Sequence, residues 1–299
     1  MDEKVITQGS LEDFSRYLIR EEKSPATMEK YLRDTRAFLA FAQDRPVSKE
    51  LVAEYKRTCI DRGYAVRSIN SMLASINSLL EFMGWPECKV KNIRMQRQTY
   101  CPEDKEMTKS EYLRLLEASS GDKRLNLVLQ TICGTGIRVS ELRHFTLEAV
   151  KAGQISVNCK GKIRTILIPK RLRSMLMNFA KSKKITSGPV FVTKSGKPLD
   201  RCNIWTQMKR LCDAAGVQPS KVFPHNLRKL FAKTYYAVER DIAKLADILG
   251  HSSINTTRIY IMTTGAEHRR QIERLGLVMH PGAMRSHNSG RAWVGPPNR

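Results

Sequence analysis

The feature that most constrains this sequence is a long amphipathic stretch in its first third. Between Ser68 and Gly84, the run "SINSMLASINSLLEFMG" places apolar residues at steps of three and four, which is the period of one helix face. These residues are Ile69, Met72, Leu73, Ile76, Leu79, Leu80 and Met83. Gly84 follows them as a typical helix stop. The pattern predicts an amphipathic helix, and helix starts at Ser24-Pro25 and Ser48 extend the prediction to the whole first third.

The opposite face of this helix carries a cation and small polar side chains. Arg67, Ser68, Asn70 and Ser71 lie on it. Such a face is ordinarily solvated. In a strongly basic chain it can also lie against DNA phosphates or base edges, so we hypothesise that these four residues contact DNA.

The chain is long enough for two domains, because a single core rarely grows beyond about 250–300 residues. Residues 85–105 lose their periodicity and gain proline and cations, which is typical of a linker. We predict an N-terminal helical domain at 1–88, a linker at 89–105 and a second domain at 106–280. The tail at 281–299 is rich in Gly, Pro, Ser and Arg and is expected to be disordered.

The second domain combines helices with a small β element. Thr108 and Glu111 have the spacing of a capping box before a helix. Further on, "QISVN" and "IRTILIP" predict a strand pair that turns at "KGK". A short strand is expected at "PVFV", followed by helices to about Leu277. The fold class is therefore predicted to be mainly α with a small β-sheet or hairpin.

The charge of the chain indicates a polyanionic partner. Its 52 Lys and Arg residues outnumber 29 Asp and Glu, giving a formal net charge of +23, which favours nucleic acid first and an anionic membrane surface second. No apolar run approaches the ~18 residues of a membrane span, and the first residues lack the form of a signal peptide. The seven cysteines form no CxxC pair, which argues against a disulfide framework or a zinc site. We expect a cytoplasmic protein with reduced thiols.

Four short motifs hold residues suited to phosphoryl transfer. They are Arg138 and Glu141 in "TGIRVSEL", Lys160 in "CKGK", His225 and Arg228 in "PHNLRK", and His251 and Tyr260 in "LGHSSINTTRIY". Each motif alone fits an ordinary cap, a surface cation or a core residue. Together, arginine forks can bind a phosphate, a phenol can attack it, and lysine or histidine can move the protons.

Other reaction classes lack their motifs. The sequence contains no acidic cluster with metal-ligand spacing, no GxxxxGK[ST] loop and no serine-elbow motif. ATP dependence and two-metal nuclease chemistry lose support, and we expect neither a metal nor another cofactor.

The order and spacing of these motifs resemble the tyrosine recombinase (phage integrase) family over about residues 5–278. In size the chain is similar to compact Xer-type enzymes and to integrases of small mobile elements, without an additional arm-binding domain. The resemblance implies a SAM-like core-binding domain before the linker and a catalytic domain after it.

The resemblance also implies a role for each motif residue. Arg138 and Arg228 would clamp the scissile phosphate, and His251 would add a hydrogen bond. His225 would assist proton movement, and Glu141 would brace the site behind the first arginine. Lys160 would act as general acid to the 5′-hydroxyl. Tyr260 would attack, giving a 3′-phosphotyrosyl bond.

Two lysines leave details open. Lys162 lies two residues from Lys160, and a shift in hairpin register would exchange their roles. Lys229 stands where many relatives have histidine, which implies a change in packing or a phosphate contact. Lys162 and Lys229 are both expected to contact DNA.

The resemblance implies a site-specific recombinase acting on duplex core sites. Four protomers would exchange strands through a Holliday junction, whereas the free protein would be a monomer or weak dimer in a prokaryotic cytoplasm, associated with the nucleoid. Integration and excision of a mobile element is the favoured task. Xer-like chromosome-dimer resolution, DNA inversion, type IB topoisomerase-like relaxation and a non-enzymatic DNA-binding role are the alternatives. The apolar stripe Ile272, Leu275 and Val278 would dock on a neighbouring protomer or pack on its own domain.

Overall fold

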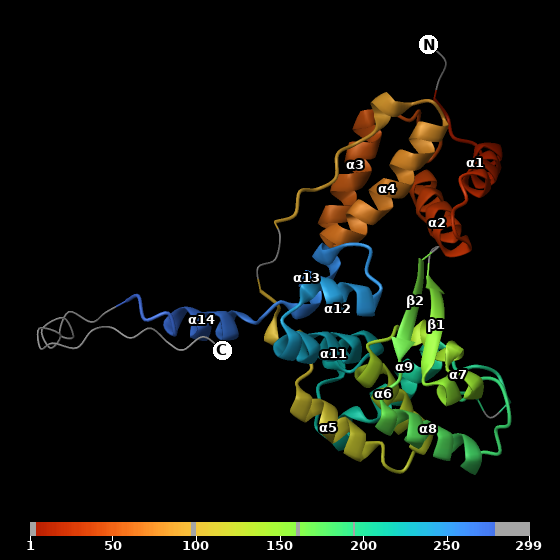
Figure 1. The fold of residues 1–299 in the computed structure, drawn as a ribbon. Helices are drawn as coiled ribbons and strands as arrows, with labels where there is room; N and C mark the ends of the chain where they lie inside the picture. The colour runs from red at the N-terminus through yellow and green to blue at the C-terminus, as the bar shows by residue number, and fades with distance from the viewer. Residues whose placement is uncertain (1–3, 97–99, 160–161, 194, 279–299) are drawn as a thin grey trace, which may run out of the picture. The chain divides into compact units, whose positions relative to one another are not determined.

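The computed structural model describes residues 4–96, 100–159, 162–193 and 195–278. The chain divides into two compact units, Met1–Arg97 and Gln98–Arg299. Both consist mainly of helices, and the second also holds a two-stranded sheet (Figure 1). The predicted fold class is confirmed. The tail at 281–299 lies outside the described residues.

The first unit is built from helices whose starts are fixed by local capping. Its helices are α1 (Gln8–Arg20), α2 (Pro25–Ala42), α3 (Lys49–Asp61) and α4 (Val66–Phe82), followed by the 3₁₀ turn η1 (Pro86–Cys88). Ser24 and Ser48 cap α2 and α3, each accepting the backbone N–H of the third residue after it. The apolar face of α4 packs on α2, with Leu73 and Ile76 fully buried. The helix predictions for this region are confirmed.

Residues 89–93, which we assigned to the linker, pack along α4. The side-chain amide of Asn77 donates to the Val90 carbonyl (2.9 Å) and accepts from the Val90 N–H (3.2 Å). Asn70 makes the same pair of bonds to Ile93, at 3.0 and 2.8 Å. Asn70, which was expected to face DNA, instead holds this backbone segment against its own helix.

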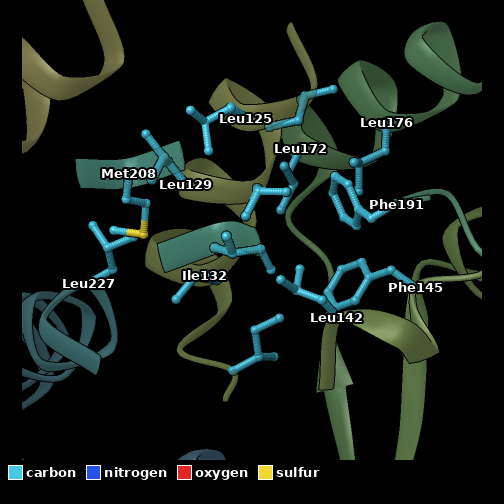
Figure 2. Close-up of a cluster of buried hydrophobic side chains, with 14 of the residues drawn as sticks. Leu125, Leu129, Ile132, Leu142, Phe145, Leu172, Leu176, Phe191, Met208 and Leu227 are labelled. Carbon is cyan, nitrogen blue, oxygen red and sulfur yellow. The ribbon is translucent and has the colours of Figure 1, made fainter. Parts of the chain in front are cut away.

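The second unit surrounds α6 with other helices. Its elements are η2 (Glu103–Lys105), α5 (Lys109–Ala118), α6 (Lys123–Thr135), η3 (Val139–His144), α7 (Leu147–Ala152), β1 (Gln154–Cys159), β2 (Lys162–Leu167), α8 (Lys170–Ser182), α9 (Arg201–Arg210), α10 (Cys212–Ala215), η4 (Pro219–Lys221), α11 (Pro224–Glu239), α12 (Ile242–Leu249), α13 (Ile254–Ile261) and α14 (Gly265–Glu273). Figure 2 shows Leu129 and Ile132 of α6 within the core, among Leu227 of α11, Phe145 and Phe191.

The predicted hairpin is confirmed, whereas the predicted strand at "PVFV" is not formed. Strands β1 and β2 pair antiparallel from Gln154↔Leu167 to Cys159↔Lys162. Around "PVFV", only the isolated bridges Thr146↔Pro189 and Val192↔Pro198 occur among the described residues. Each bridge involves a proline, which lacks the N–H needed to extend a ladder.

The final described helix, α14, has no buried residue. The stripe that we expected to dock or pack is exposed, at 54% for Ile272, 63% for Leu275 and 96% for Val278. Among the described residues, no helix is long and apolar enough to cross a membrane.

Candidate active site

Arg228 is a buried cation at the centre of the candidate site. It lies one turn into α11, is only 2% exposed, and donates to the carbonyls of Gly136 and Leu249, each at 2.6 Å. Burial, followed by the charge of Arg138, lowers the pKa of Arg228 to about 10, so it remains protonated at neutral pH. Its Nε is buried and has no hydrogen-bond partner among the described residues. A buried guanidinium with an unused donor is suited to receive an anion.

Arg138 is held by Glu141 and by the end of α12. Its backbone N–H and its guanidinium donate to the Glu141 carboxylate at 2.7 and 3.1 Å. The guanidinium also donates to the Gly250 carbonyl at 3.0 Å. Glu141 is 4% exposed, which places a negative charge beneath the arginine. Glu141 thus holds both the backbone and the guanidinium of Arg138.

His251 follows the left-handed Gly250 that ends α12, as the sequence predicted. Its Nε2 lies 3.0 Å from the Arg228 guanidinium, and its Nδ1 lies 2.9 Å from the hydroxyl of Thr257. Burial, followed by the charges of Arg228 and Arg138, lowers the pKa of His251 to about 4. His251 is therefore neutral at physiological pH.

Tyr260 lies on α13, facing both histidines. Its hydroxyl is 3.5 Å from Nδ1 of His225, and its ring centre is 4.9 Å from the ring of His225 and 4.8 Å from that of His251. The guanidinium carbon of Arg228 lies 5.8 Å from the centre of the same ring. Helices α12 and α13 both contact α11 in the folded unit (Figure 1). Their packing brings Tyr260 beside a cation and two potential proton acceptors.

His225 occupies the first turn of α11, three residues before Arg228. Its ring stacks on Phe223, with an interplanar angle of 4°. Part of the residue is exposed. The surrounding protein atoms, followed by the charges of Lys229 and Arg228, nevertheless lower the pKa of His225. A neutral His225 can accept the proton of the Tyr260 phenol.

Of the three lysines singled out in the sequence, the structure describes Lys162 and Lys229. Lys160 lies outside the described residues. Lys162 is the first residue of β2 and pairs with Cys159 in the strand register. Lys229 is half-buried, and its charge acts on His225.

The predicted DNA-contacting residues of the first unit line a separate hollow. Arg67, Ser68 and Ser71 are exposed around a space of about 490 Å³. Its lining also includes Lys30, Arg33, Asp34, Tyr64 and Met72. Asn70 does not line this hollow, because its side-chain amide is bonded to the backbone of Ile93.

Sequence reasoning missed two residues that contact this site, Arg164 and Thr257. Arg164 precedes Ile166 and Ile168 by two and four positions, and both isoleucines are buried. A charged residue in phase with a buried strand face was therefore the available signal. Thr257 precedes Tyr260 by three positions, which is one helix turn, and it is fully buried.

Comparison with known proteins identifies the family. Residues 105–267 match the Phage integrase family, and residues 11–86 match the phage integrase N-terminal SAM-like domain. The chain belongs to the phage integrase family. It is 30% identical to the tyrosine recombinase XerA of Pyrococcus furiosus over 288 residues, covering 93% of this chain and 98% of the relative. The enzyme is thus a tyrosine recombinase, of the class that cleaves and rejoins DNA, as predicted.

Two further similarities extend over most of this recombinase. The tyrosine recombinase XerD of Staphylococcus aureus is 27% identical over 299 residues, covering 91% of this chain and 99% of the relative. A crystal structure of lambda integrase (75–356), solved as a dimer bound to a COC′ core site, matches with a TM-score of 0.70 at 18% identity, covering 87% of this chain and 96% of that one. The latter similarity supports the fold alone. Among the described residues, no three His, Cys, Asp or Glu side chains group in a way that could hold a metal ion.

Proposed function

We propose that Tyr260 is the nucleophile of this recombinase and that Arg138, His225, Arg228 and His251 form its phosphate pocket. The observation that carries the proposal is the 3.5 Å separation between the Tyr260 hydroxyl and Nδ1 of His225, beside the buried Arg228. Neutral His225 is positioned to accept the phenolic proton as the oxygen attacks. Attack forms a bond from the Tyr260 oxygen to phosphorus and breaks the bond from phosphorus to the 5′-oxygen. A hairpin lysine, Lys160 or Lys162, protonates the leaving oxygen.

The charges around Tyr260 favour the transition state of this transfer. Two arginines, Arg138 and Arg164, donate to one carboxylate, that of Glu141, and their charges also act on Arg228. These four groups carry a net charge of about +2, which matches the dianionic pentacoordinate phosphate better than the monoanionic phosphodiester. The pocket therefore stabilises the transition state more than the bound substrate.

Duplex DNA is the proposed partner. The net charge of +23 favours salt-dependent binding to its phosphates. Lambda integrase has been solved as a tetramer bound to a Holliday junction, and this chain shares its fold with a TM-score of 0.67. We propose that four copies of this chain assemble on two synapsed core sites in the same way, in the cytoplasm at the nucleoid. The domain bounds 1–88, 89–105 and 106–280 remain our proposal for the functional parts.

The first biological task to test is integration and excision of a mobile element. Xer-like resolution of chromosome dimers is the second candidate, because the curated relatives XerA and XerD match over nearly the full length of the chain. The two tasks use the same chemistry on core sites in different places. A mobile element carries its core site beside the gene, whereas a resolution site lies elsewhere in the chromosome.

A covalent trapping experiment tests the nucleophile. Nicked duplexes cut from DNA flanking the gene, and a library of randomised duplexes, are incubated with wild-type, Tyr260→Phe and Tyr236→Phe proteins. Tyr236 of α11 is a suitable control because it packs against the small hydrophobic cluster that contains Tyr260. We expect a protein–DNA adduct with the wild type and Tyr236→Phe, and none with Tyr260→Phe. An adduct formed by Tyr260→Phe would show that another residue attacks.

The same experiment separates the two tasks. An adduct on the flanking duplexes supports a mobile element. Selection of a site only from the randomised library, with a match far from the gene, supports resolution. Relaxation of a supercoiled plasmid that lacks the selected site would instead support the topoisomerase-like alternative.

A further inference from the structure

Arg164 is a charged residue on the inner face of the hairpin. On strand β2 its position alternates with the exposed Ile163, which is 74% accessible, and it shares the face of the buried Ile166. The Arg164 side chain is itself only 9% exposed. Because a buried guanidinium is costly unless its charge and donors are used, its partners indicate what it does.

The guanidinium of Arg164 connects two other elements of the candidate site. One terminal nitrogen donates to Glu141 Oε2 at 2.5 Å, and the other donates to the Ile248 carbonyl at 2.5 Å. Glu141 belongs to η3, which follows Arg138, and Ile248 belongs to the last turn of α12, which precedes His251. Strand β2 is thus attached to both segments that hold the phosphate pocket.

Gly250 makes room for this side chain. A Cβ atom at Gly250 would lie 2.5 Å from Cδ and 2.9 Å from Nε of Arg164. The left-handed conformation of Gly250, at φ = 63°, also favours glycine. Arg164 therefore lies directly against the backbone that carries the Arg138 hydrogen bond and positions His251.

Arg164 also competes with Arg138 for the carboxylate of Glu141. The carboxylate accepts hydrogen bonds from both Arg138 and Arg164. Without Arg164, Glu141 would interact with Arg138 alone, and the net charge of the pocket would fall by one. Arg138 would then stabilise the added negative charge on the phosphate less effectively.

We propose that Arg164 is a positioning residue of the recombination reaction, which shares the Glu141 carboxylate with Arg138 and fixes the end of α12 before His251. This inference rests on the proposed function of the same site. Arg164 acts through Arg138 and His251 rather than by touching the reacting atoms.

The test compares two substrates that differ in charge at the scissile phosphate. Single-turnover adduct formation is measured on a nicked duplex with an ordinary phosphate and on one with a neutral methylphosphonate. The variants are Arg164→Met and Arg164→Lys, with Arg124→Met as the matched control. Arg124 is also half-buried and donates to a distant carbonyl, that of Val192. Among the described residues, no hydrogen bond or ion pair joins it to the proposed site.

We expect Arg164→Met to slow adduct formation on the phosphate by about 10- to 100-fold, with unchanged DNA affinity. On the methylphosphonate, which needs less charge stabilisation, the defect should shrink to a few-fold at most. Arg164→Lys should show a smaller defect with the same substrate dependence, because lysine keeps the charge but cannot reach both acceptors. Arg124→Met should match the wild type on both substrates.

Equal defects on both substrates would assign Arg164 a merely structural role, and the absence of any defect would also overturn the proposal. Thermal unfolding of each variant identifies one that fails to fold. In that case Arg164→Lys alone carries the comparison. Adduct formation by Tyr260→Phe tests the proposed function separately. If that variant still forms the adduct, the assigned site is wrong, and the Arg164 proposal falls with it.

Discussion

Nδ1 of His251 lies 2.9 Å from the hydroxyl oxygen of Thr257, a fully buried side chain on α13. The other ring nitrogen, Nε2, lies 3.0 Å from the Arg228 guanidinium, which can only donate. Nε2 therefore accepts, and the ring proton is assigned to Nδ1, which donates to Thr257. Once a phosphate accepts from Arg228 instead, the Thr257 hydroxyl can donate to Nδ1. His251 can then present an N–H at Nε2 to the phosphate.

This relationship predicts that Thr257→Val slows the reaction. Valine has a similar shape but offers Nδ1 neither a donor nor an acceptor, and a lost buried hydrogen bond costs about 1–3 kcal/mol. We expect single-turnover adduct formation to fall by about 10- to 100-fold with unchanged DNA affinity, since about 1.4 kcal/mol corresponds to a tenfold change. Thr257→Ser keeps the hydroxyl and should remain near the wild-type rate. Equal rates for the two variants would contradict the hydroxyl's role.

The lowered pKa of His251 predicts a specific acid sensitivity. Its folded pKa of about 4 lies below its ordinary value of 6.5, so the unfolded chain binds more protons between these values. Stability is therefore retained above about pH 6.5 and lost as the pH falls towards 4. From about pH 7.5 to about pH 5, the free energy of unfolding should lose about 2 kcal/mol through this group.

Urea unfolding of the wild type and of His251→Asn at both pH values measures this contribution. Asparagine does not titrate, so the variant should lose less stability on acidification. Groups that do not interact with His251 titrate alike in both proteins and cancel in the difference, whereas His225, whose charge acts on His251, is the exception. Parallel losses in the two proteins would mean that His251 is not held neutral by the fold.

Much of this architecture could be predicted because its determinants are local. Ser24 and Ser48 cap helices with their own side chains, and Thr108 forms its predicted capping box with Glu111. Gly250 ends α12 because it adopts the left-handed conformation within its own turn. The motifs around Arg138, His225 and Tyr260 were recognised for a similar reason, since each is a short run of sequence.

Contacts between distant segments could not be predicted in this way. Arg228 alone could have been a surface arginine, and its burial depends on carbonyls 92 and 21 residues away. Arg164 contacts Ile248 across 84 residues. Asn70 lies on a polar helix face, as predicted, but the helical period cannot show that the chain returns to it at Ile93. The expected strand at "PVFV" is not formed because a strand also depends on its partner, and each of the two bridges there includes a proline.

Gly136 is predicted to tolerate no side chain. It ends α6 at φ = 65°, and a Cβ would lie 2.3 Å from Cδ1 of Phe231 and 3.1 Å from Cδ2 of Leu249. Left-handed backbone costs about 1–2 kcal/mol for alanine, and overpacking adds about 1–3 kcal/mol. We expect Gly136→Ala to lower the free energy of unfolding by about 2–5 kcal/mol. It should also slow catalysis, because the Gly136 carbonyl holds Arg228.

Gly216 is the matched control for this substitution. It is also left-handed, at φ = 57°, but a Cβ there would meet nothing within 4 Å. Gly216→Ala should therefore cost only the backbone contribution, about 1–2 kcal/mol in urea unfolding, and leave adduct formation unchanged. Similar losses for the two variants would show that the Phe231 ring moves aside without cost.

Asn70 and Asn77 of α4 each hold one backbone residue through two hydrogen bonds, and replacing each asparagine should have a separate local effect. Asn77→Ala removes both hydrogen bonds to Val90, and Asn70→Ala removes both to Ile93. Each bond contributes about 1 kcal/mol, so hydrogen exchange at the released amide should accelerate by about tenfold. Exchange at Val90 should respond mainly to Asn77→Ala, and exchange at Ile93 mainly to Asn70→Ala. Each variant thus serves as the control for the other.

DNA affinity measured on the same variants decides between two roles for Asn70. The structure assigns its amide to the Ile93 backbone. Asn70→Ala should therefore accelerate exchange at Ile93 and leave the affinity for duplex DNA close to that of the wild type. Ser71→Ala is a useful comparison, because Ser71 is exposed one residue further along the helix. If Asn70→Ala weakened DNA binding while exchange at Ile93 stayed unchanged, the original expectation of a DNA contact would hold.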